Sequence, residues 1–438
     1  MLKHFMMAWV IVASVAVSTV RAQVLDAPAG DWPWWRGPLF NGVAASGPKP
    51  PVEWSETKNV AWKVPVSGRG HSSPTVIGNR VLLATADDKA QTQSVVCFDR
   101  KTGSRLWKRD VNVGGFPEHI HPKNTHATAT IASDGTRLFA SFLHHDSVHL
   151  VALDLSGKPV WQQVAGKFTP DEYKNGYAAS PLLYGDLVIV AGDYDGDDSF
   201  LTAFDRVTGE RVWQTARPAR INYASPVVAH VGGRDQLLIS GCDIVAGYDP
   251  LDGKQLWTAT ATTMATAGTM VWDQDLVFAS GGYPDAETVC IRADASGKVV
   301  WRNKQKCYEQ SMLAHAGHLY AINDGGVAYC WDAETGDERW HHRLRGPLNA
   351  SPILANGNIY APNELGTIWV YRASPKQFEL VAENQLGSEM FATPTICGGQ
   401  LFLRVANVTG DARQEMLYCI QNSSSIGLPS GKSAIGRP

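Results

Sequence analysis

The sequence has little net charge, few helical patterns and no long apolar run after residue 20. A formal charge of -3 on 438 residues gives no electrostatic reason to expect binding to nucleic acid or to an anionic membrane. None of the seven cysteines is adjacent to another or part of a C-x-x-C pair, so neither a dense disulfide framework nor a zinc ribbon is indicated. An all-β fold class is therefore favoured.

Catalytic motifs are also missing. The sequence contains no G-x-S-x-G, no H-E-x-x-H and no phosphate-binding glycine loop, since Gly68-Arg69-Gly70 lacks the third glycine and a following helix. No catalytic residue is predicted, and the protein is interpreted as non-catalytic.

What is present is a repeat, seen most clearly from Asp205 through Gly209 to Trp213. The Asp side chain accepts hydrogen bonds within its own turn, and Gly takes the left-handed backbone conformation that other residues adopt at a cost. Apolar runs flank each copy, so each is interpreted as a β-hairpin turn. The other copies end at Trp107, Trp161, Trp257, Trp301 and Trp340.

A second mark, Ser-Pro or a variant of it, precedes each hairpin and suits the start of a strand. Eight such starts occur, at Ser73, Thr130, Ser180, Ser225, Thr269, Ser311, Ser351 and Thr393. With an apolar run between start and hairpin, each unit has four short strands. Trp residues recur roughly every 40 to 55 positions, as in four-stranded propeller blades. We therefore expect an eight-bladed β-propeller.

The ends of the chain predict how the ring closes. Residues 60–64 resemble a closing strand with its own Trp62 but have no preceding start, whereas the eighth unit has only three strands. We expect residues 60–64 to pair beside residues 416–419 and complete the last blade. The seventh unit lacks the Asp-to-Gly turn and has Leu380 near the Trp position.

Four segments are predicted. Residues 1–22 have the basic, apolar and small-residue regions of a signal peptide, so we expect an exported protein, periplasmic or extracellular. No cysteine follows the apolar run, so no stable membrane anchor is expected. Residues 23–58, rich in Trp, Pro and Gly, are expected to pack on the propeller at 59–421, with Trp34 contributing less stability than Trp257. Residues 422–438 are expected to be a disordered tail.

The repeat resembles the pyrroloquinoline-quinone-like (PQQ-like) family, whose pattern Ala203 to Trp213 matches position by position. The resemblance covers about residues 59–421. It implies that the repeat tryptophans dock neighbouring blades: Trp62, Trp107, Trp161, Trp213, Trp257, Trp301 and Trp340. Some members are quinoprotein dehydrogenases, and others, such as BamB-type proteins, are cofactor-free scaffolds. This chain looks closer to the scaffolds because it lacks the adjacent cysteine pair of the dehydrogenases. It also lacks the lipid-attachment cysteine of BamB-type proteins.

Two clusters are candidate ligand sites. Six histidines fall on one connection and one loop of the second unit, namely His119, His121, His126, His144, His145 and His149. Neutral imidazole is a good metal ligand, so convergence there would make a metal or quinone contact, against the alternative of surface histidines without a ligand. The acid-rich run with Asp193, Asp195 and Asp197 resembles a Ca²⁺ loop but lacks the Gly and Glu spacing of an EF-hand, so a solvated turn is the alternative.

The functional prediction rests on the charges of the loop-rich rim. Its loops between second and third strands hold thirteen acids and two bases, while the connections between blades are rich in Arg and Lys. This mixture of signs is typical of a protein-contact face. We expect a monomeric binding or assembly scaffold for a protein or cell-envelope component, with no cofactor and no nucleic acid. The alternative is an oxidoreductase with a quinone or metal over the channel.

Overall fold

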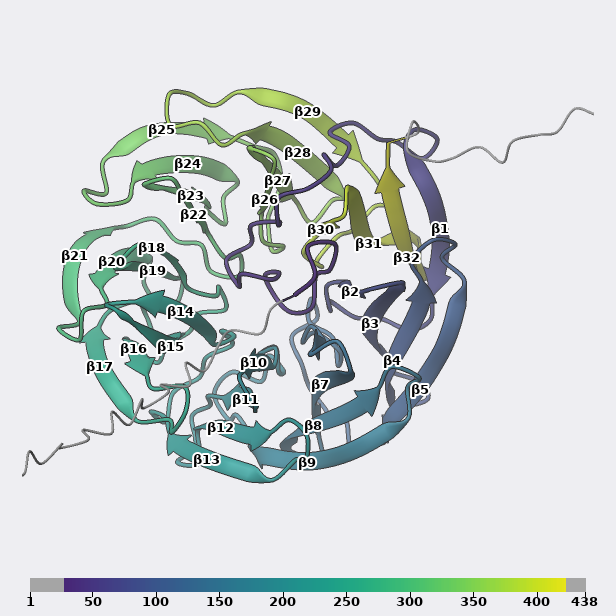
Figure 1. The fold of residues 1–438 in the computed structure, drawn as a ribbon, viewed down its shortest axis with the longest axis horizontal. Coiled ribbons are helices and arrows are strands. Elements are labelled where there is room, and N and C mark those ends of the chain that lie inside the picture. Colours follow the sequence, from purple (N-terminus) through teal and green to yellow (C-terminus); the bar gives the residue numbers. More distant parts are fainter. Residues whose placement is uncertain (1–26, 423–438) are drawn as a thin grey trace, which may run out of the picture.

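The computed structural model describes residues 27–422. The predicted signal peptide and most of the predicted tail lie outside these residues. The described chain forms eight four-stranded antiparallel sheets arranged around a central axis as propeller blades (Figure 1). No helix within residues 27–422 is long and apolar enough to cross a membrane. The expected all-β, eight-bladed propeller is confirmed.

In each blade the strands run from the channel outward. Blade 1 contains β2 (Thr75–Ile77), β3 (Arg80–Asp87), β4 (Thr92–Asp99) and β5 (Arg105–Val113). Blade 2 contains β6 (Ala132–Ser133), β7 (Arg137–His144), β8 (Ser147–Asp154) and β9 (Pro159–Lys167). Blade 3 contains β10 (Leu182–Tyr184), β11 (Leu187–Gly192), β12 (Phe200–Asp205) and β13 (Arg211–Ala216). Blade 4 contains β14 (Val227–Val231), β15 (Arg234–Gly241), β16 (Ile244–Tyr248) and β17 (Gln255–Thr260).

The second half repeats this order. Blade 5 contains β18 (Val271–Asp273), β19 (Leu276–Gly281), β20 (Glu287–Arg292) and β21 (Lys298–Asn303). Blade 6 contains β22 (Leu313–His315), β23 (His318–Ile322), β24 (Val327–Asp332) and β25 (Glu338–Arg343). Blade 7 contains β26 (Ile353–Ala355), β27 (Asn358–Pro362), β28 (Thr367–Arg372) and β29 (Leu380–Gln385). Blade 8 contains β30 (Thr395–Cys397), β31 (Gln400–Thr409), β32 (Ala412–Gln421) and the N-terminal β1 (Val60–Val66).

The last blade is built from both ends of the described chain. β1 pairs antiparallel with β32, with Trp62 opposite Cys419 and Val64 opposite Leu417. This is the pairing that the incomplete eighth unit predicts. It gives the last blade the same four strands as the other seven and covers the edge of β32.

The repeat turn joins each blade to the preceding one. Gly209 has a φ of +77°, and a Cβ on it would lie 2.7 Å from Cδ2 of Trp161 in blade 2. Glycine is therefore favoured here for two reasons: its left-handed backbone conformation, and the indole that leaves no room for a Cβ. Five repeat tryptophans also donate their indole N–H to a backbone carbonyl in the next blade: Trp62 to Arg100, Trp107 to Leu155, Trp161 to Arg206, Trp301 to Ala333 and Trp340 to Ser374. We propose that these contacts dock the blades.

The other two repeat tryptophans differ. The indole nitrogen of Trp257 donates to Gln236 within its own blade at 2.6 Å, and that of Trp213 is buried without a hydrogen-bond partner among the described residues. Trp213 nevertheless packs on the next turn, since a Cβ on Gly253 would lie 2.5 Å from its ring.

Blade 7 has no tryptophan at this position. In the other blades the Trp faces the residue just before a β-bulge, and in blade 7 this register pairs Val370 with Ala382. The expectation that Leu380 stands near the Trp position is thus off by two residues, and Leu380 is half exposed. The structure of blade 8 explains why blade 7 lacks this Trp. Its third and fourth strands come from opposite ends of the described chain, so no turn is present for a blade 7 indole to cover.

The strand starts form a second ring, which we call the hydroxyl ring: Ser73, Thr130, Ser180, Ser225, Thr269, Ser311, Ser351 and Thr393. Six of these hydroxyl oxygens accept a hydrogen bond from the backbone N–H of the preceding ring member. For example, Ser180 accepts one from Thr130 at 2.9 Å. The same link joins Ser73 to Thr130, Ser180 to Ser225, Thr269 to Ser311, Ser311 to Ser351 and Ser351 to Thr393. The hydroxyl residue that recurs at the strand starts therefore links neighbouring blades around the channel.

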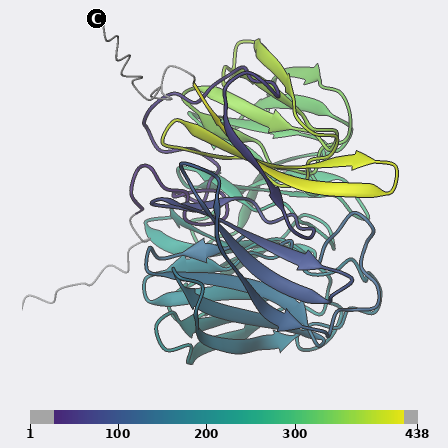
Figure 2. The ribbon, with the colours of Figure 1, turned by 90° about the vertical axis from the view of Figure 1, so that its right-hand side faces the viewer.

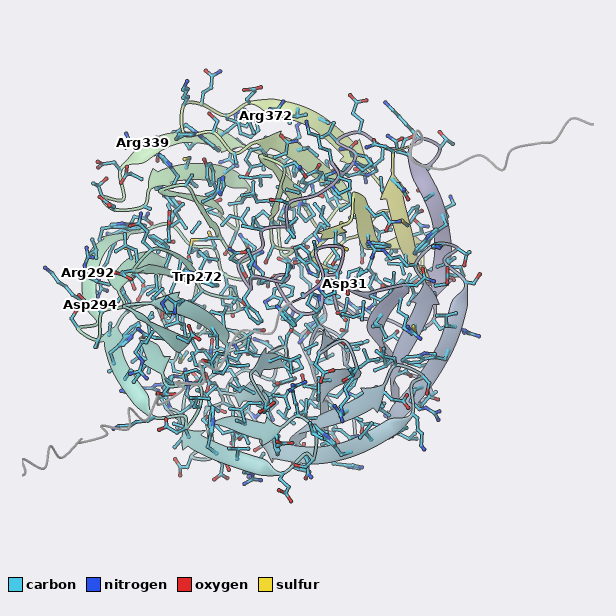
Figure 3. The ribbon with its side chains drawn as sticks, in the orientation of Figure 1. Asp31, Trp272, Arg292, Asp294, Arg339 and Arg372 are labelled. Atoms are coloured by element: carbon cyan, nitrogen blue, oxygen red, sulfur yellow. The ribbon has the colours of Figure 1, made fainter. Side chains whose placement is uncertain are left out.

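The N-terminal segment, residues 27–58, crosses one face of the disc (Figures 1 and 2). It bridges to the inner strands at Trp32 with Val76 and at Val43 with Leu354. Figure 3 places Asp31 near the centre of the disc, whereas Asp294 of a repeat turn lies at its perimeter.

Trp35 and Arg36 continue this segment towards the far blades. The Trp35 indole donates to the hydroxyl of Thr269 at 2.8 Å, and the buried Arg36 donates to the carbonyls of Pro352 and Met312. The segment thus closes one end of the channel.

Trp34 lies deep in this segment. Only 1% of its surface is exposed, compared with 5% for Trp257, and it stacks on Phe40 with ring centroids 4.9 Å apart. The expectation that Trp34 contributes less than Trp257 does not agree with this burial. The physical reason is that the segment fills the entrance of the channel and so has inner strands on several sides.

Candidate functional site

The central channel contains a cavity of about 240 Å³. Each blade contributes the residue two positions before its hydroxyl-ring member, because alternate residues of an extended chain point the same way. We call these eight residues the channel ring: His71, Thr128, Ala178, Tyr223, Ala267, Glu309, Asn349 and Phe391. The hydroxyl ring has the same chemistry in every blade, whereas the channel ring has a different mixture on each side. The channel ring is therefore the part of the channel that can select a ligand.

One end of the cavity is formed by the N-terminal segment and the other opens on the loop-rich rim. Trp35 lines the closed end, and the exposed side chains of His121 and Lys123 stand at the mouth. Lys123 Nζ donates to both carboxylate oxygens of Glu364, at 2.9 Å each. This ion pair joins the connection before blade 2 to a loop of blade 7, so it reaches across the mouth.

Glu309 is the second charged side chain of the lining. The side chain is accessible, but protein atoms around the channel limit its hydration. This loss of hydration, together with the nearby Glu364, raises the pKa of Glu309 to about 7. At neutral pH Glu309 can therefore both donate and accept a proton in a hydrogen bond.

His71 and Phe391 form the wall at blades 1 and 8. Their rings stack with centroids 4.7 Å apart. Burial holds the pKa of His71 well below 6.5, and the neighbouring Arg69 and Arg404 lower it further. His71 is thus neutral, and its Nε2 is buried without a hydrogen-bond partner among the described residues.

The predicted histidine cluster only partly converges. His144 lies 4.3 Å from His145 and 5.0 Å from His149 between ring centroids. His126 instead packs on Phe116, and His121 lines the channel mouth. His119 is exposed on the same connection. Within residues 27–422, no group of three or more His, Cys, Asp or Glu side chains is arranged to hold a metal ion.

The acid-rich run does not gather its carboxylates either. Asp193 is buried and forms an ion pair with Arg217 at 2.9 Å, while Asn222 donates to the same carboxylate. Asp195 accepts two backbone N–H groups, from Asp171 and Glu172, and Asp197 is exposed. A buried ion pair and a capped loop account for these residues.

The residues of the channel do not fit a quinone cofactor that carries several carboxylates. Such an anion needs free cations, and Lys123, the one cation lining the cavity in the described chain, is already paired with Glu364. The seven cysteines are buried singly as free thiols.

Sequence reasoning missed the channel residues Glu309, Lys123, His71 and Phe391. The signal was available for three of them, since Glu309, His71 and Phe391 each stand two positions before a strand start. Lys123 has no comparable signal because its partner Glu364 is 241 positions away.

The model of the PQQ-like family described as "Outer membrane protein assembly factor BamB" matches residues 91–315 and 285–376, more than half of the chain. The chain belongs to this family.

Individual relatives divide between two roles. The chain is 29% identical over 227 residues to the outer membrane protein assembly factor BamB of Burkholderia pseudomallei, covering 50% of this chain and 51% of the relative. It is also 29% identical over 187 residues to a 1-butanol dehydrogenase (quinone) of Thauera butanivorans, covering 38% of this chain and 27% of that relative. The chain thus spans about half the length of the first relative and about a quarter of the second.

A solved structure shares the fold. The crystal structure of BamB from Moraxella catarrhalis aligns with a TM-score of 0.58 at 15% identity, covering 84% of this chain and 99% of that chain. This likeness supports the propeller architecture.

Proposed function

We propose that the protein is an exported, non-catalytic binding or assembly scaffold whose partner docks on the rim around the channel mouth. The partner is a protein or another cell-envelope component. Membership in the BamB family supports this role. The observation that carries it is the asymmetry of the two faces, since one is covered by residues 27–58 and the other presents the open rim.

The rim has the composition of a contact surface. Exposed apolar side chains stand there among charges, with Val113 69%, Leu365 54% and Tyr283 45% exposed. Tyr283 also contacts Tyr173 from another blade, with ring centroids 5.5 Å apart. Exposed aromatic and aliphatic groups surrounded by polar ones are typical of the centre of protein interfaces.

A pull-down from envelope extract tests this assignment. Tagged protein should retain a specific partner that is lost in the double variant Tyr283→Glu and Leu365→Glu, because two charges would be buried without partners in the interface. Val207→Glu is the matched control, since Val207 is 46% exposed on a repeat turn of the opposite face. Equal recovery of the partner by both variants would refute docking on the rim.

A quinone-dependent oxidoreductase is the second candidate, favoured by the relative described as a 1-butanol dehydrogenase (quinone). Reconstitution with pyrroloquinoline quinone and Ca²⁺, followed by dye reduction with alcohols and sugars, separates the two functions. The scaffold proposal expects no turnover above that of the cofactor alone, and clear turnover would replace it.

A further inference from the structure

Four tyrosines gather on one side of the channel mouth, and we call them the tyrosine cluster. The rings of Tyr173 and Tyr283 meet edge to face with centroids 5.5 Å apart, and the hydroxyl of Tyr173 donates to that of Tyr283 at 3.3 Å. The hydroxyl of Tyr223 donates to the backbone carbonyl of Tyr173, also at 3.3 Å. Tyr308 packs on the backbone next to Tyr283, since a Cβ on Gly282 would lie 2.4 Å from Cβ of Tyr308.

The tyrosine cluster is held in place by contacts between blades. Tyr173 stands on the connection between blades 2 and 3, and Tyr283 on a loop of blade 5. Asn175 fixes a third ring by donating to the hydroxyl of Tyr223 at 2.8 Å. Tyr173 is half-buried and Tyr283 is 45% exposed, so both rings remain accessible. Because the rings are already positioned, a partner that binds to them orders few side chains and loses little entropy.

Carboxylates surround the tyrosine cluster. Asp171 and Glu172 are exposed on the connection between blades 2 and 3, and the carboxylate of Asp195 accepts the backbone N–H of both. Asp197 and Asp285 are exposed on loops of blades 3 and 5. None of these five carboxylates forms an ion pair with another side chain within residues 27–422, in contrast to Asp243 and Asp324 on neighbouring loops.

The cations of this sector are mostly paired. Lys306 forms an ion pair with Asp324 at 3.3 Å and donates to the carbonyl of Gly282, and Arg220 forms an ion pair with Asp243 at 3.7 Å. The exposed Lys174 and Lys304 have no such partner in the described part of the chain, but the unpaired carboxylates outnumber them. An excess of negative charge therefore remains around the tyrosine cluster, which attracts a positively charged partner.

An accessible aromatic surface among free carboxylates is suited to arginine. The face of a tyrosine ring attracts a cation placed over it. The guanidinium group is planar, stacks on aromatic rings and is more weakly hydrated than an ammonium group, so arginine fits better than lysine. The carboxylates lie on three separate segments, at Glu172, Asp197 and Asp285. One cationic side chain cannot reach all three, whereas an extended segment with several arginines can.

We propose that the tyrosine cluster and its carboxylates bind an extended, arginine-rich segment of the protein partner. Guanidinium groups stack on Tyr173 and Tyr283 and pair with the carboxylates beside them. This inference rests on the proposed function, because it gives the chemistry of the partner that docks on the rim.

Fluorescence anisotropy on the full chain tests the site with a short labelled peptide of alternating Gly and Arg. Matched peptides carry Lys or Glu in place of Arg. The Arg peptide should bind most tightly, the Lys peptide more weakly and the Glu peptide not at all, and added salt should weaken binding by screening the charges. No binding of the Arg peptide up to about 1 mM, near the weak end of specific affinity, would overturn the proposal.

Variants locate the binding. Tyr283→Leu keeps an apolar side chain without the aromatic face and should weaken binding about two- to fivefold, whereas Tyr283→Phe should keep it. The double variant Asp197→Asn and Asp285→Asn should also weaken it. Its matched control, Glu210→Gln with Glu334→Gln, removes the same charge from exposed repeat turns of the opposite face and should leave affinity unchanged. Unchanged affinity in Tyr283→Leu, or equal losses in the two double variants, would show attraction by bulk charge alone and refute the site.

The pull-down from envelope extract separates this inference from the proposed function. A partner retained through the rim, together with no binding of the Arg peptide, would leave the scaffold role standing and refute the arginine site. Peptide binding that depends on Tyr283 without any retained partner would support the site and count against the scaffold role. Where both occur, an excess of the Arg peptide should release the partner, and a partner that stays bound would contradict the inference.

Discussion

The indole nitrogen of Trp62 donates a hydrogen bond to the backbone carbonyl of Arg100, 2.9 Å away. Since Trp62 belongs to the last blade and Arg100 to the first, this contact crosses the closure of the ring. Trp62→Ala should lower the free energy of unfolding by about 3 to 5 kcal/mol, the usual range for truncating a large buried aromatic. Chemical unfolding measures it, with Leu106→Ala on an exposed strand face as the control. Equal losses would show that closure does not depend on Trp62.

Removing β1 altogether should have a different result. Deletion of residues 59–65 exposes the edge of β32, which is paired with β1 in the structure. We expect soluble yield to fall and soluble aggregates to form, as measured by light scattering, because unpaired edges recruit other strands. A monodisperse deletion variant would contradict this prediction.

The N-terminal segment should be as important for stability as the blades. Trp34→Ala is expected to cost about 3 to 5 kcal/mol, similar to Trp257→Ala, since both side chains are buried. Urea unfolding of both variants under the same conditions compares them. A cost for Trp34→Ala below half that of Trp257→Ala would mean that the segment packs loosely.

Two glycines separate backbone strain from blade packing. Gly209 and Gly233 have φ values of +77° and +73°, but only Gly209 has an indole against it, since nothing lies within 4 Å of a Cβ on Gly233. Gly233→Ala should cost about 1 to 2 kcal/mol from the left-handed conformation alone. Gly209→Ala should cost a further 1 to 3 kcal/mol, roughly the range for overpacking. Similar unfolding midpoints would show that Trp161 moves aside freely.

Asp193 should act through its ion pair. Asp193→Asn leaves the buried Arg217 without a counter-charge and should destabilise the protein by about 3 to 5 kcal/mol. Asp197→Asn, on an exposed position of the same loop, should change stability by less than about 0.5 kcal/mol. Ca²⁺ should not alter the melting temperature of either variant or of the wild type. Stabilisation by Ca²⁺ that Asp193→Asn abolishes would restore the Ca²⁺ loop hypothesis.

The histidine cluster should make the protein acid-sensitive. Burial, together with the neighbouring His144 and His145, lowers the pKa of His149 to about 4. Between pH 6.5 and 4 the unfolded chain therefore binds more protons at this group than the folded chain, so stability falls as the pH is lowered through this window. His149→Gln should reduce the drop in melting temperature between pH 7 and 4.5. An unchanged drop would assign acid sensitivity to His71 and His126, whose pKa values burial also lowers.

Local signals explain why the propeller could be predicted. The turn from Asp205 to Trp213 needs its Asp, Gly and Trp at fixed spacing for reasons internal to two strands and one neighbour. In blade 7 the position equivalent to the repeat Trp is Ala382, two residues after the predicted Leu380. The β-bulge after Val370 shifts the register, and residue spacing alone does not reveal a bulge.

The channel was less accessible to prediction. The sequence shows that Glu309 and Phe391 each stand two positions before a strand start. That both line the same cavity follows only from closure of the ring. Contacts such as Trp35 with Thr269 or Lys123 with Glu364 join residues more than 200 positions apart without any local pattern. The histidines show the reverse case: closeness in sequence made them one candidate site, with surface histidines without a ligand as the alternative, and His126 packs on Phe116 away from His144 and His149.

The segment that closes the channel also sets an order of assembly. Arg36 finds its acceptors on Met312 and Pro352, which a ribosome adds 276 and 316 residues later. Synthesis and folding usually proceed from the N-terminus, domain by domain. Trp32 can bridge to Val76 once blade 1 exists, but Arg36 has neither acceptor until blades 6 and 7 are made, so the segment completes its docking late. A chain interrupted before residue 312 would leave Arg36 without either carbonyl acceptor, although Trp34 would already have its neighbours from blades 3 and 4.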